Sequence, residues 1–336
     1  MMNALVTGGA GFIGSHICRR LVKDGHQVVA IDNLSNGSME NLKELEGNSQ
    51  FTFYKFDINN TIKLRGVFDQ YPFDMVFHFA ANADVSKGEE NTLIDVSDTL
   101  QTTLNVLEMM RIYEIKKFFF ASSSTVYGNA EERLQKHRSI MRPISHYGAA
   151  KLASEAFISS FSHLHDFKVW IARFCNAVGP NMRHGVIHDL IKKLQAHPDS
   201  LEVFGNGTQL KPYIYIDDLV EGVMTLLEKT NEDYNAYLVG VDSSLTVDQI
   251  AQIVMDEVGV HVPIHYGGRY SGWKGDVRKY QYDVSRLRLM GWTPKFTAEE
   301  AVRKAIRENL NNNNDIQYGK KSFNNRCYRS GWFLSF

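Results

Sequence analysis

Short apolar runs alternate with amphipathic segments along the first half of the chain. The runs are nearly continuous in apolar residues, which is typical of strands in a parallel sheet that is covered on both faces. They span residues 3–7, 27–31, 51–56, 74–80, 116–122 and 168–174. Apolar residues at helical spacing lie between them, for example over 15–25 and 100–114. This alternation predicts a doubly wound α/β sheet with right-handed crossovers.

The pattern changes after about residue 176, where Gly, Pro and Asn become more frequent and the apolar runs become shorter. Helical spacing returns over 217–229, 246–258 and 297–309. We therefore expect a first domain over residues 1–175 and a smaller α/β lobe over 176–310, interleaved with the first. Residues 311–336 begin with NNNND and lack clear periodicity, so we expect a disordered tail or a late packing strap.

Composition excludes several classes of protein. The chain has 336 residues and a formal net charge of −1, whereas a broad nucleic-acid surface needs a basic excess. The cysteines, Cys18, Cys175 and Cys327, form neither a disulfide framework nor a CxxC metal pair. No apolar run approaches the length of about 18 residues that spans a bilayer, and the N-terminus lacks the pattern of a secretory signal. We expect a cytoplasmic protein that binds neither nucleic acid nor membrane.

A glycine-rich turn joins the first expected strand to the first expected helix. Gly8, Gly11 and Gly14 recur every third residue in VTGGAGFIGSHI, with Phe12 and Ile13 between them. Glycine permits a tight turn and close approach of the backbone to a ligand, and the following helix offers free N–H groups to a phosphate. Strand, turn and helix in this order predict a dinucleotide site.

An acidic residue, Asp32, ends the second expected strand and is followed by Asn33. Asp32 is placed to accept hydrogen bonds from both ribose hydroxyls of an adenosine. A 2′-phosphate would be repelled and no Arg follows directly, so the sequence favours NAD over NADP; a carboxylate that caps a turn is the alternative. Asp57 and Ile58, after the third strand, are placed to meet the adenine, with a plain helix cap as the alternative for Asp57.

Tyr147 and Lys151 lie four residues apart in SHYGAAKLASE. Side chains at this spacing are neighbours on a helix surface. From this stretch alone, an ordinary Tyr–Lys pair on a solvated helix is the simpler interpretation. The segment SSSTVYG ends the fifth expected strand, however, and open α/β sheets bind ligands at the carboxyl ends of their strands.

Taken together, these motifs resemble the extended short-chain dehydrogenase/reductase family, within it the NAD-dependent nucleotide-sugar epimerases and dehydratases. The similarity covers about residues 3–308 in unbroken order, through TGGAGFIG, DNLSNG, HFAA, SSSTVYG, YGAAK, RFCNAVGP, GNGTQLKPYIYIDD and GDV…DVSRLRLMGW. It implies a Rossmann doubly wound parallel sheet with a smaller C-terminal α/β substrate lobe. It also implies tightly bound NAD, with Phe79, Ala80 and Ala81 in the cofactor site, and a homodimer built on the helices near 100–112 and 148–162.

The resemblance assigns the chemistry to Ser123, Tyr147 and Lys151. Tyr147 would remove a proton from a sugar hydroxyl with Ser123 bridging, and Ser124 is close enough in sequence to share that role. Lys151 would hold the nicotinamide ribose and lower the pKa of Tyr147, which is about 10 in free tyrosine. Transfer of hydride to NAD and back to the other face of a 4-keto sugar would invert one carbon of a nucleotide sugar.

Substrate contacts are implied in the second half of the chain. Asn176 would touch the diphosphate, Lys211 stands where epimerases often have an Arg, and Asp276 would lie near the nucleotide ribose. Trp273 aligns with another epimerase Arg, so Lys274, Arg269 or Arg278 would supply that charge. The bulk of Tyr280 favours a plain hexose. Asp98 stands where the family has an Asn. The loop 129–146 is unusually basic and lies between the catalytic Ser and Tyr, so an altered substrate preference is expected from it.

Related dehydratases place Asp-Glu after the catalytic Ser/Thr, whereas this chain has Ser124 and Thr125. The sequence therefore favours 4-epimerisation, with a UDP-hexose as the leading substrate. A nucleotide-sugar 4-dehydrogenase or a dehydratase of the same family stays open, as does a non-catalytic NAD-binding sensor or scaffold. The spacing of His184, His188 and Asp189 could suggest a metal site, but the family needs none and we expect none.

Overall fold

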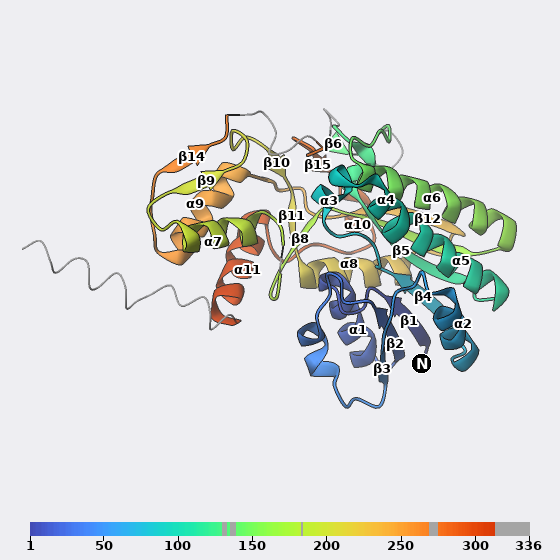
Figure 1. The fold of residues 1–336 in the computed structure, drawn as a ribbon. Coiled ribbons are helices and arrows are strands. Elements are labelled where there is room, and N and C mark those ends of the chain that lie inside the picture. The colour runs from blue at the N-terminus through green and yellow to red at the C-terminus, as the bar shows by residue number, and fades with distance from the viewer. Residues whose placement is uncertain (130–132, 135–138, 183, 269–274, 313–336) are drawn as a thin grey trace, which may run out of the picture.

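The computed structural model describes residues 1–129, 133–134, 139–182, 184–268 and 275–312, with a main body of stacked α/β layers and a smaller lobe beside it (Figure 1). Lys274, Trp273, Arg269, Cys327 and the tail beyond residue 312 lie outside the described residues. Among the described residues, no helix is both long and apolar enough to cross a membrane.

A seven-stranded parallel sheet forms the centre of the main body, in the order β12-β7-β5-β4-β1-β2-β3. The strands are β1 (Asn3–Thr7), β2 (Gln27–Asp32), β3 (Phe51–Lys55), β4 (Met75–His78), β5 (Lys117–Ser123), β7 (Lys168–Phe174) and β12 (Tyr234–Val239). The six expected strands are confirmed. The strand order reverses at β1 and β4, and a doubly wound sheet binds its ligands at that point, beyond the carboxyl ends of the strands.

The seventh strand, β12, was not expected from the sequence. Asn235 interrupts its apolar run, although the residue is only 1% exposed. Its amide can be buried because Nδ2 donates hydrogen bonds to the carbonyl oxygens of Val169 at 3.1 Å and Glu232 at 2.5 Å. Its Oδ1 has no hydrogen-bond partner among the described residues, so only the donor side of this amide is satisfied. This buried polar residue concealed an edge strand in the sequence pattern.

Helices cover both faces of the sheet, because alternate residues of each strand point to opposite sides. Leu5 and Val29 pack with α2 (Thr61–Gln70), α5 (Thr102–Ile112) and α6 (His146–His165). Val6 and Ala30 pack with α1 (Phe12–Lys23) and α8 (Ile216–Lys229) on the other face. Short helices complete this region: η1 (Met39–Leu45), α3 (Val85–Glu90), α4 (Thr92–Asp95), η2 (Val96–Gln101) and η3 (Ser124–Tyr127).

The smaller lobe is built from longer helices and short paired strands. The helices are α7 (Val186–Ala196), α9 (Val247–Val258), α10 (Ser285–Leu289) and α11 (Ala298–Asn312). The strand pairs are β8 (Asn176–Val178) with β11 (Tyr213–Tyr215), β9 (Leu201–Val203) with β14 (Ile264–Tyr266), β10 (Leu210–Lys211) with β13 (Leu245–Thr246), and β6 (Arg133–Leu134) with β15 (Gln281–Tyr282). Because α8 and β12 return to the main sheet, a cut at residue 175 remains a proposed division of the chain rather than a spatial boundary.

A buried ion pair joins β7 to α6 directly under the carboxyl end of β5. Arg173 Nη2 lies 2.6 Å from Glu155 Oε2, and the two side chains are 5% and 3% exposed. Glu155 Oε1 also accepts a hydrogen bond from the Ser122 hydroxyl at 2.5 Å, and Arg173 Nη1 donates to the Tyr127 hydroxyl at 2.6 Å. Each ion therefore has several partners in place of the water that it lost on folding.

Replacing one partner of this pair should be more harmful than replacing both. Arg173→Met leaves the Glu155 carboxylate buried without its cation, which costs about 3–5 kcal/mol of unfolding free energy. The double variant Arg173→Met/Glu155→Leu should recover much of that loss. Urea unfolding of the three proteins measures the difference, and equal losses in the single and double variants would contradict it.

Candidate active site

A cleft of about 1010 Å³ runs from the turn after β1 to the smaller lobe. Arg278, a candidate to supply the charge of the missing epimerase Arg, does not line this cleft, but the other catalytic, cofactor and substrate candidates that the structure describes do. These are Gly8, Gly11, Phe12, Ile13, Gly14, Asp32, Asn33, Asp57, Ile58, Phe79, Ala80, Ala81, Ser123, Ser124, Tyr147, Lys151, Asn176, Lys211 and Asp276. Residues that are far apart in the sequence are thus brought to one place by the strand order.

The glycine turn is so tight that side chains are excluded from it. Gly8 has a φ of +68°, and its N–H donates to the Ile31 carbonyl at 2.8 Å. A Cβ on Gly14 would lie 2.2 Å from the Gly8 carbonyl oxygen, and a Cβ on Gly8 would lie 2.7 Å from the Ala80 nitrogen. Helix α1 follows with Gly11 as N-cap and no side-chain cap, so its first N–H groups face the cleft without a side-chain acceptor. This turn fits a pyrophosphate.

Asp32 lies at the end of β2 with its carboxylate held by backbone. Its Oδ2 accepts from the Ala10 N–H at 3.0 Å and its Oδ1 from the Leu34 N–H at 2.7 Å, while burial raises its pKa. Each carboxylate oxygen can accept further bonds, so the group fits the ribose role. Asp57 is linked to the same region, because Asn33 Nδ2 donates to its Oδ2 at 3.1 Å.

The alternative of a plain helix cap does not describe Asp57. The side chain that caps α2 is that of Asn60, whose Oδ1 accepts from the Lys63 N–H at 3.1 Å. Asp57 Oδ1 instead accepts from the Asn59 N–H at 2.8 Å and stabilises the preceding turn.

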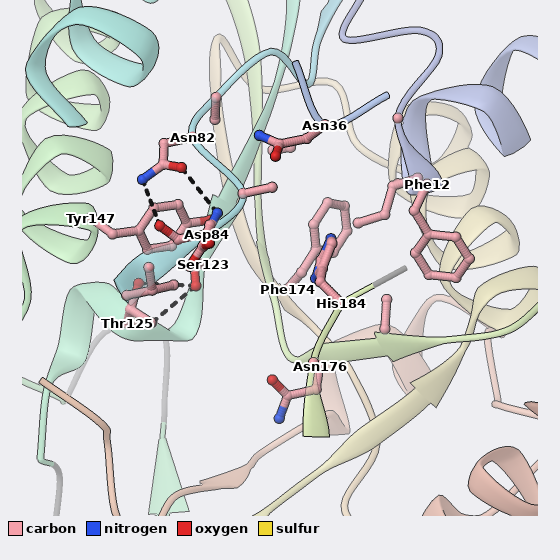
Figure 2. A pocket seen from close by; sticks show the side chains of 18 of the residues that line it. Phe12, Asn36, Asn82, Asp84, Ser123, Thr125, Tyr147, Phe174, Asn176 and His184 are labelled. Carbon is pink, nitrogen blue, oxygen red and sulfur yellow. Dashed lines mark hydrogen bonds between the residues drawn. The ribbon is translucent and has the colours of Figure 1, made fainter. Parts of the chain in front are cut away.

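Ser123 and Tyr147 meet at the carboxyl end of β5. The Ser123 hydroxyl accepts hydrogen bonds from the Thr125 N–H at 3.2 Å and the Thr125 hydroxyl at 3.0 Å (Figure 2). Tyr147 lies in the first turn of α6, which begins after Ser145 caps it by accepting from the Gly148 N–H at 3.1 Å. The cap of α6 and the end of β5 together place the Tyr147 phenol beside Ser123. A hydrogen bond to Ser123 favours the phenolate.

Lys151 lies one turn further along α6 and is 2% exposed. Its Nζ donates to the Ala121 carbonyl at 2.6 Å and lies 5.8 Å from the centroid of the Tyr147 ring. Burial lowers the pKa of Lys151 to about 7, although the charges of Glu155 and Asp95 favour the ammonium. A lysine that titrates near neutrality is unusual and occurs where a site needs a tunable charge.

We expected Lys151 to lower the pKa of Tyr147, but the groups of the protein together raise it. Burial raises the pKa of Tyr147 to about 12, and the charge of Asp95 acts in the same direction. The reason is that Lys151 directs its ammonium to a backbone carbonyl, so desolvation of the phenolate dominates. A lower pKa would need an additional positive charge in the cleft.

The substrate end of the cleft is polar and aromatic. Asn176 Nδ2 lies 3.3 Å from both the Pro212 carbonyl oxygen and the Tyr280 hydroxyl, and Lys211 forms an ion pair with Asp276. Ser124 is only 5% exposed and bonds to the hydroxyls of Tyr280 and Tyr282 rather than Tyr147. The Ser124 hydroxyl therefore faces these two tyrosines, whereas that of Ser123 bonds Tyr147.

Several residues that line the cleft were missed in the sequence. They are Asn82, Asp84, Phe174, Lys193 and Phe204. The Asn82 amide brackets Asp84, donating to its carbonyl at 2.8 Å and accepting from its N–H at 3.0 Å (Figure 2). The sequence position of Asn82 and Asp84 could have indicated them, because both residues closely follow HFAA at the carboxyl end of β4. No cluster of three or more metal-ligating side chains occurs within the described part of the chain, His184, His188 and Asp189 included.

The doubly wound sheet, the glycine turn and the Ser–Tyr–Lys group define the class: a dinucleotide-binding protein of the short-chain dehydrogenase/reductase type. The model of the NAD dependent epimerase/dehydratase family matches residues 4–240. This chain belongs to that family.

Known proteins of similar sequence and structure support the assignment. A UDP-glucuronate 4-epimerase of Thermodesulfobacterium geofontis is 30% identical over 308 residues, covering 90% of this chain and 94% of the relative. A crystal structure of a UDP-galactose 4-epimerase is 36% identical, with a TM-score of 0.81 and coverage of 91% and 98% of the two chains. The UDP-glucuronic acid 4-epimerase of Bacillus cereus, solved with UDP-glucuronic acid and NAD, is 27% identical with a TM-score of 0.82 over the same shares.

Gly14→Ala should weaken NAD binding at least ~10-fold, because its Cβ would displace the Gly8 carbonyl and distort the phosphate turn. Isothermal titration with NAD measures the effect. Gly66→Ala is a matched control on α2, since a Cβ there meets no atom within 4 Å. Equal affinity of the two variants would show that the tight turn is not the cofactor cradle.

Proposed function

We propose that this protein is an NAD-dependent nucleotide-sugar 4-epimerase that acts on a UDP-hexose. The observation that carries the proposal is the meeting of Ser123, Tyr147 and Lys151 in one cleft with the glycine turn. A sensor or scaffold has no need of all three groups. The buried free thiols of Cys18 and Cys175 are compatible with a reducing cytoplasm, which we also infer.

The side chains of this cleft can perform the proton chemistry. Tyr147 takes the proton from the sugar hydroxyl, and Ser123 relays or holds it through its hydrogen bond to the phenol. Lys151 holds a positive charge beside the pair and is placed to bind a ribose hydroxyl. NAD, which fits the turn, supplies a hydride acceptor that can return the hydride to the opposite face of the sugar.

Two features support a neutral hexose and an epimerase. Ser124 and Thr125 replace the Asp-Glu that an elimination would need, which argues against a dehydratase. Asp84 lines the cleft in the segment after β4, with Lys87 Nζ 3.9 Å from its Oδ2, and we propose that a carboxylate on the sugar would meet the like charge of Asp84 there. Asn176 and the Lys211–Asp276 pair are proposed to contact the diphosphate and nucleotide ribose, and Lys274 a phosphate.

The decisive assay incubates the purified protein, without added NAD, with UDP-glucose, UDP-galactose, UDP-glucuronate and GDP-hexoses. Inversion of a UDP-hexose supports the proposal, and inversion of UDP-glucuronate alone would contradict the role of Asp84. Accumulation of NADH or release of a keto sugar would select the dehydrogenase or dehydratase. NAD binding without conversion of any sugar would instead select the sensor or scaffold.

Tyr147→Phe should lower the epimerisation rate at least ~10²-fold, the usual scale for losing a positioned acid–base group. Tyr113→Phe is the control, because that phenol after α5 bonds Asp69 and Arg65 on α2 and does not line the cleft. The ratio of the two rate constants at saturating substrate is the measurement. Similar rates for both variants would remove Tyr147 from the mechanism.

The pKa of Tyr147, raised to about 12 by burial, should fall when oxidised NAD is bound. A positive nicotinamide favours the phenolate, and the rate falls as the pH drops below that lowered pKa because the base becomes protonated. Phenolate absorbance of the wild type minus that of Tyr147→Phe, recorded against pH with and without NAD, measures the shift. An unchanged pKa would contradict the proposed coupling.

We propose that the protein is a homodimer built on α5 and α6. These helices pack together and leave apolar side chains exposed, with Ile112, Phe157 and Leu164 at 45%, 44% and 69%. Phe157→Asp should convert the dimer to a monomer in light-scattering measurements, because a charge would be buried at the interface. Ile62→Asp, an exposed apolar residue on α2, is the control and should leave the mass unchanged.

A further inference from the structure

Asp95, the last residue of α4, is a buried carboxyl with one unpartnered oxygen. It is 1% exposed, and its Oδ1 accepts a hydrogen bond from Asn82 Nδ2 at 2.9 Å. Its Oδ2 makes no hydrogen bond. A Cβ on Gly88 would lie 1.8 Å from Oδ2, so α3 presses directly on this oxygen. A buried, unpartnered carboxylate oxygen reduces stability, and such a cost persists where function uses the group.

The groups that act on Asp95 come mainly from α6, against which α3, α4 and η2 pack. His146 and Lys151 on α6 favour the carboxylate, and Asp98 on η2 opposes it. Asp95 in turn favours the Lys151 ammonium and opposes the Tyr147 phenolate. The position of the carboxyl thus couples it to both members of the Tyr–Lys pair.

The other buried carboxylate near Lys151 is Glu155, which is in bidentate contact with Arg173, at 3.0 Å and 2.6 Å between Nε and Oε1 and between Nη2 and Oε2. Its charge still favours the Lys151 ammonium, more than that of Asp95 does. Lys151 itself donates to a carbonyl, which carries no net charge. Asp95 is therefore a second buried carboxylate that acts on Lys151, and it differs from Glu155 in having an oxygen without a hydrogen-bond partner among the described residues.

Asp95 also has a geometric link to the cleft. The Asn82 amide that donates to Asp95 also brackets Asp84, and Asn82 N–H donates to the Thr99 hydroxyl at 3.2 Å. Asn82 and Asp84 line the cleft beside Tyr147 (Figure 2). A change at Asp95 is thus transmitted to the wall of the sugar site as well as to the acid–base pair.

We propose that Asp95 is a positioning residue of this site: buried where α4 packs against α6, its carboxylate holds the Asn82–Asp84 segment in the cleft wall and acts electrostatically on the Tyr147–Lys151 pair. This role rests on the proposed epimerase function. The role of Asp95 requires no additional ligand, because Asp95 acts on the proton of Tyr147 and the charge of Lys151. Both side chains belong to this chain.

The test is the pH profile of kcat/KM for Asp95→Asn, which removes the charge and keeps an acceptor for Asn82. Without Asp95, the pKa of Tyr147 falls and so does the pKa of Lys151. Both the acid limb and the alkaline limb should therefore move to lower pH by about half a unit or more. Asp69→Asn, which removes an exposed carboxylate on α2, is the control and should move neither limb. Unmoved limbs in Asp95→Asn would overturn the proposal.

A second readout does not depend on sugar turnover. The phenolate absorbance of the NAD-loaded protein, minus that of the same protein carrying Tyr147→Phe, should titrate at lower pH in Asp95→Asn than in the wild type. If no nucleotide sugar is converted but this shift occurs, the proposed function fails and the role of Asp95 stands. If sugars are converted but the titration is unchanged, the role of Asp95 fails and the function stands.

Stability distinguishes this role from a structural one. Burial raises the pKa of Asp95, so its contribution to stability is present below the ordinary Asp pKa and is lost as the pH rises through the raised value. At neutral pH, Asp95→Asn and Asp95→Ala should therefore be at least as stable as the wild type in urea unfolding. Failure of both variants to fold, or a loss of stability with an unmoved pH profile, would show that Asp95 is only structural.

Discussion

The contact between the Gly8 carbonyl and Gly14 is the constraint on which the site depends. The first turn of α1 passes so close to the end of β1 that a side chain at either position would collide with backbone. This close packing aims the N-terminus of α1 into the cleft and leaves its N–H groups toward a phosphate. The opposite wall of the same turn is Ala80, which follows β4, so the turn lies between the ends of β1 and β4. The crevice lies there because the strand order reverses between these two strands.

Burial governs the other end of the cleft. Desolvation moves the pKa of Tyr147 up and that of Lys151 down, so both groups are biased toward their neutral forms. A protonated tyrosine cannot accept a proton, and a neutral lysine carries no positive charge. The surrounding charges therefore decide whether the two groups are ionised. Glu155, although paired with Arg173, and Asp95 both favour the Lys151 ammonium, and a bound cofactor would add its charge to this balance. Electrostatic control of this kind links cofactor binding to the ionisation of the base.

Local patterns identified much of the fold and the site. Apolar runs located six strands because most of their residues are buried or half-buried, and the glycine spacing located the turn because a side chain at Gly8 or Gly14 would collide with backbone. The Tyr147–Lys151 spacing survives in the structure because a helix always brings those positions together. The edge strand β12 was missed because Asn235 is polar in the sequence, and its burial depends on the carbonyls of Val169 and Glu232, to which its amide donates. Ser124 could not be told apart from Ser123 in the sequence, because only the folded chain shows that Ser123 bonds Tyr147 and Ser124 bonds Tyr280.

The order of residues along the chain determined the fold class and the cofactor turn, because these follow from periodicity and short-range spacing. The proposed roles of Tyr147 and Lys151 came from the resemblance of several motifs to one family, since their spacing alone also fits an ordinary pair on a solvated helix. Tertiary packing settled which charges face that pair. Asp95 lies more than fifty residues from Tyr147 in the chain, and nothing local marks it as a partner. Its influence arises because α3, α4 and η2 pack against α6 and exclude water. Electrostatic energies depend on burial and distance in space, and neither quantity can be read from neighbouring letters of a sequence.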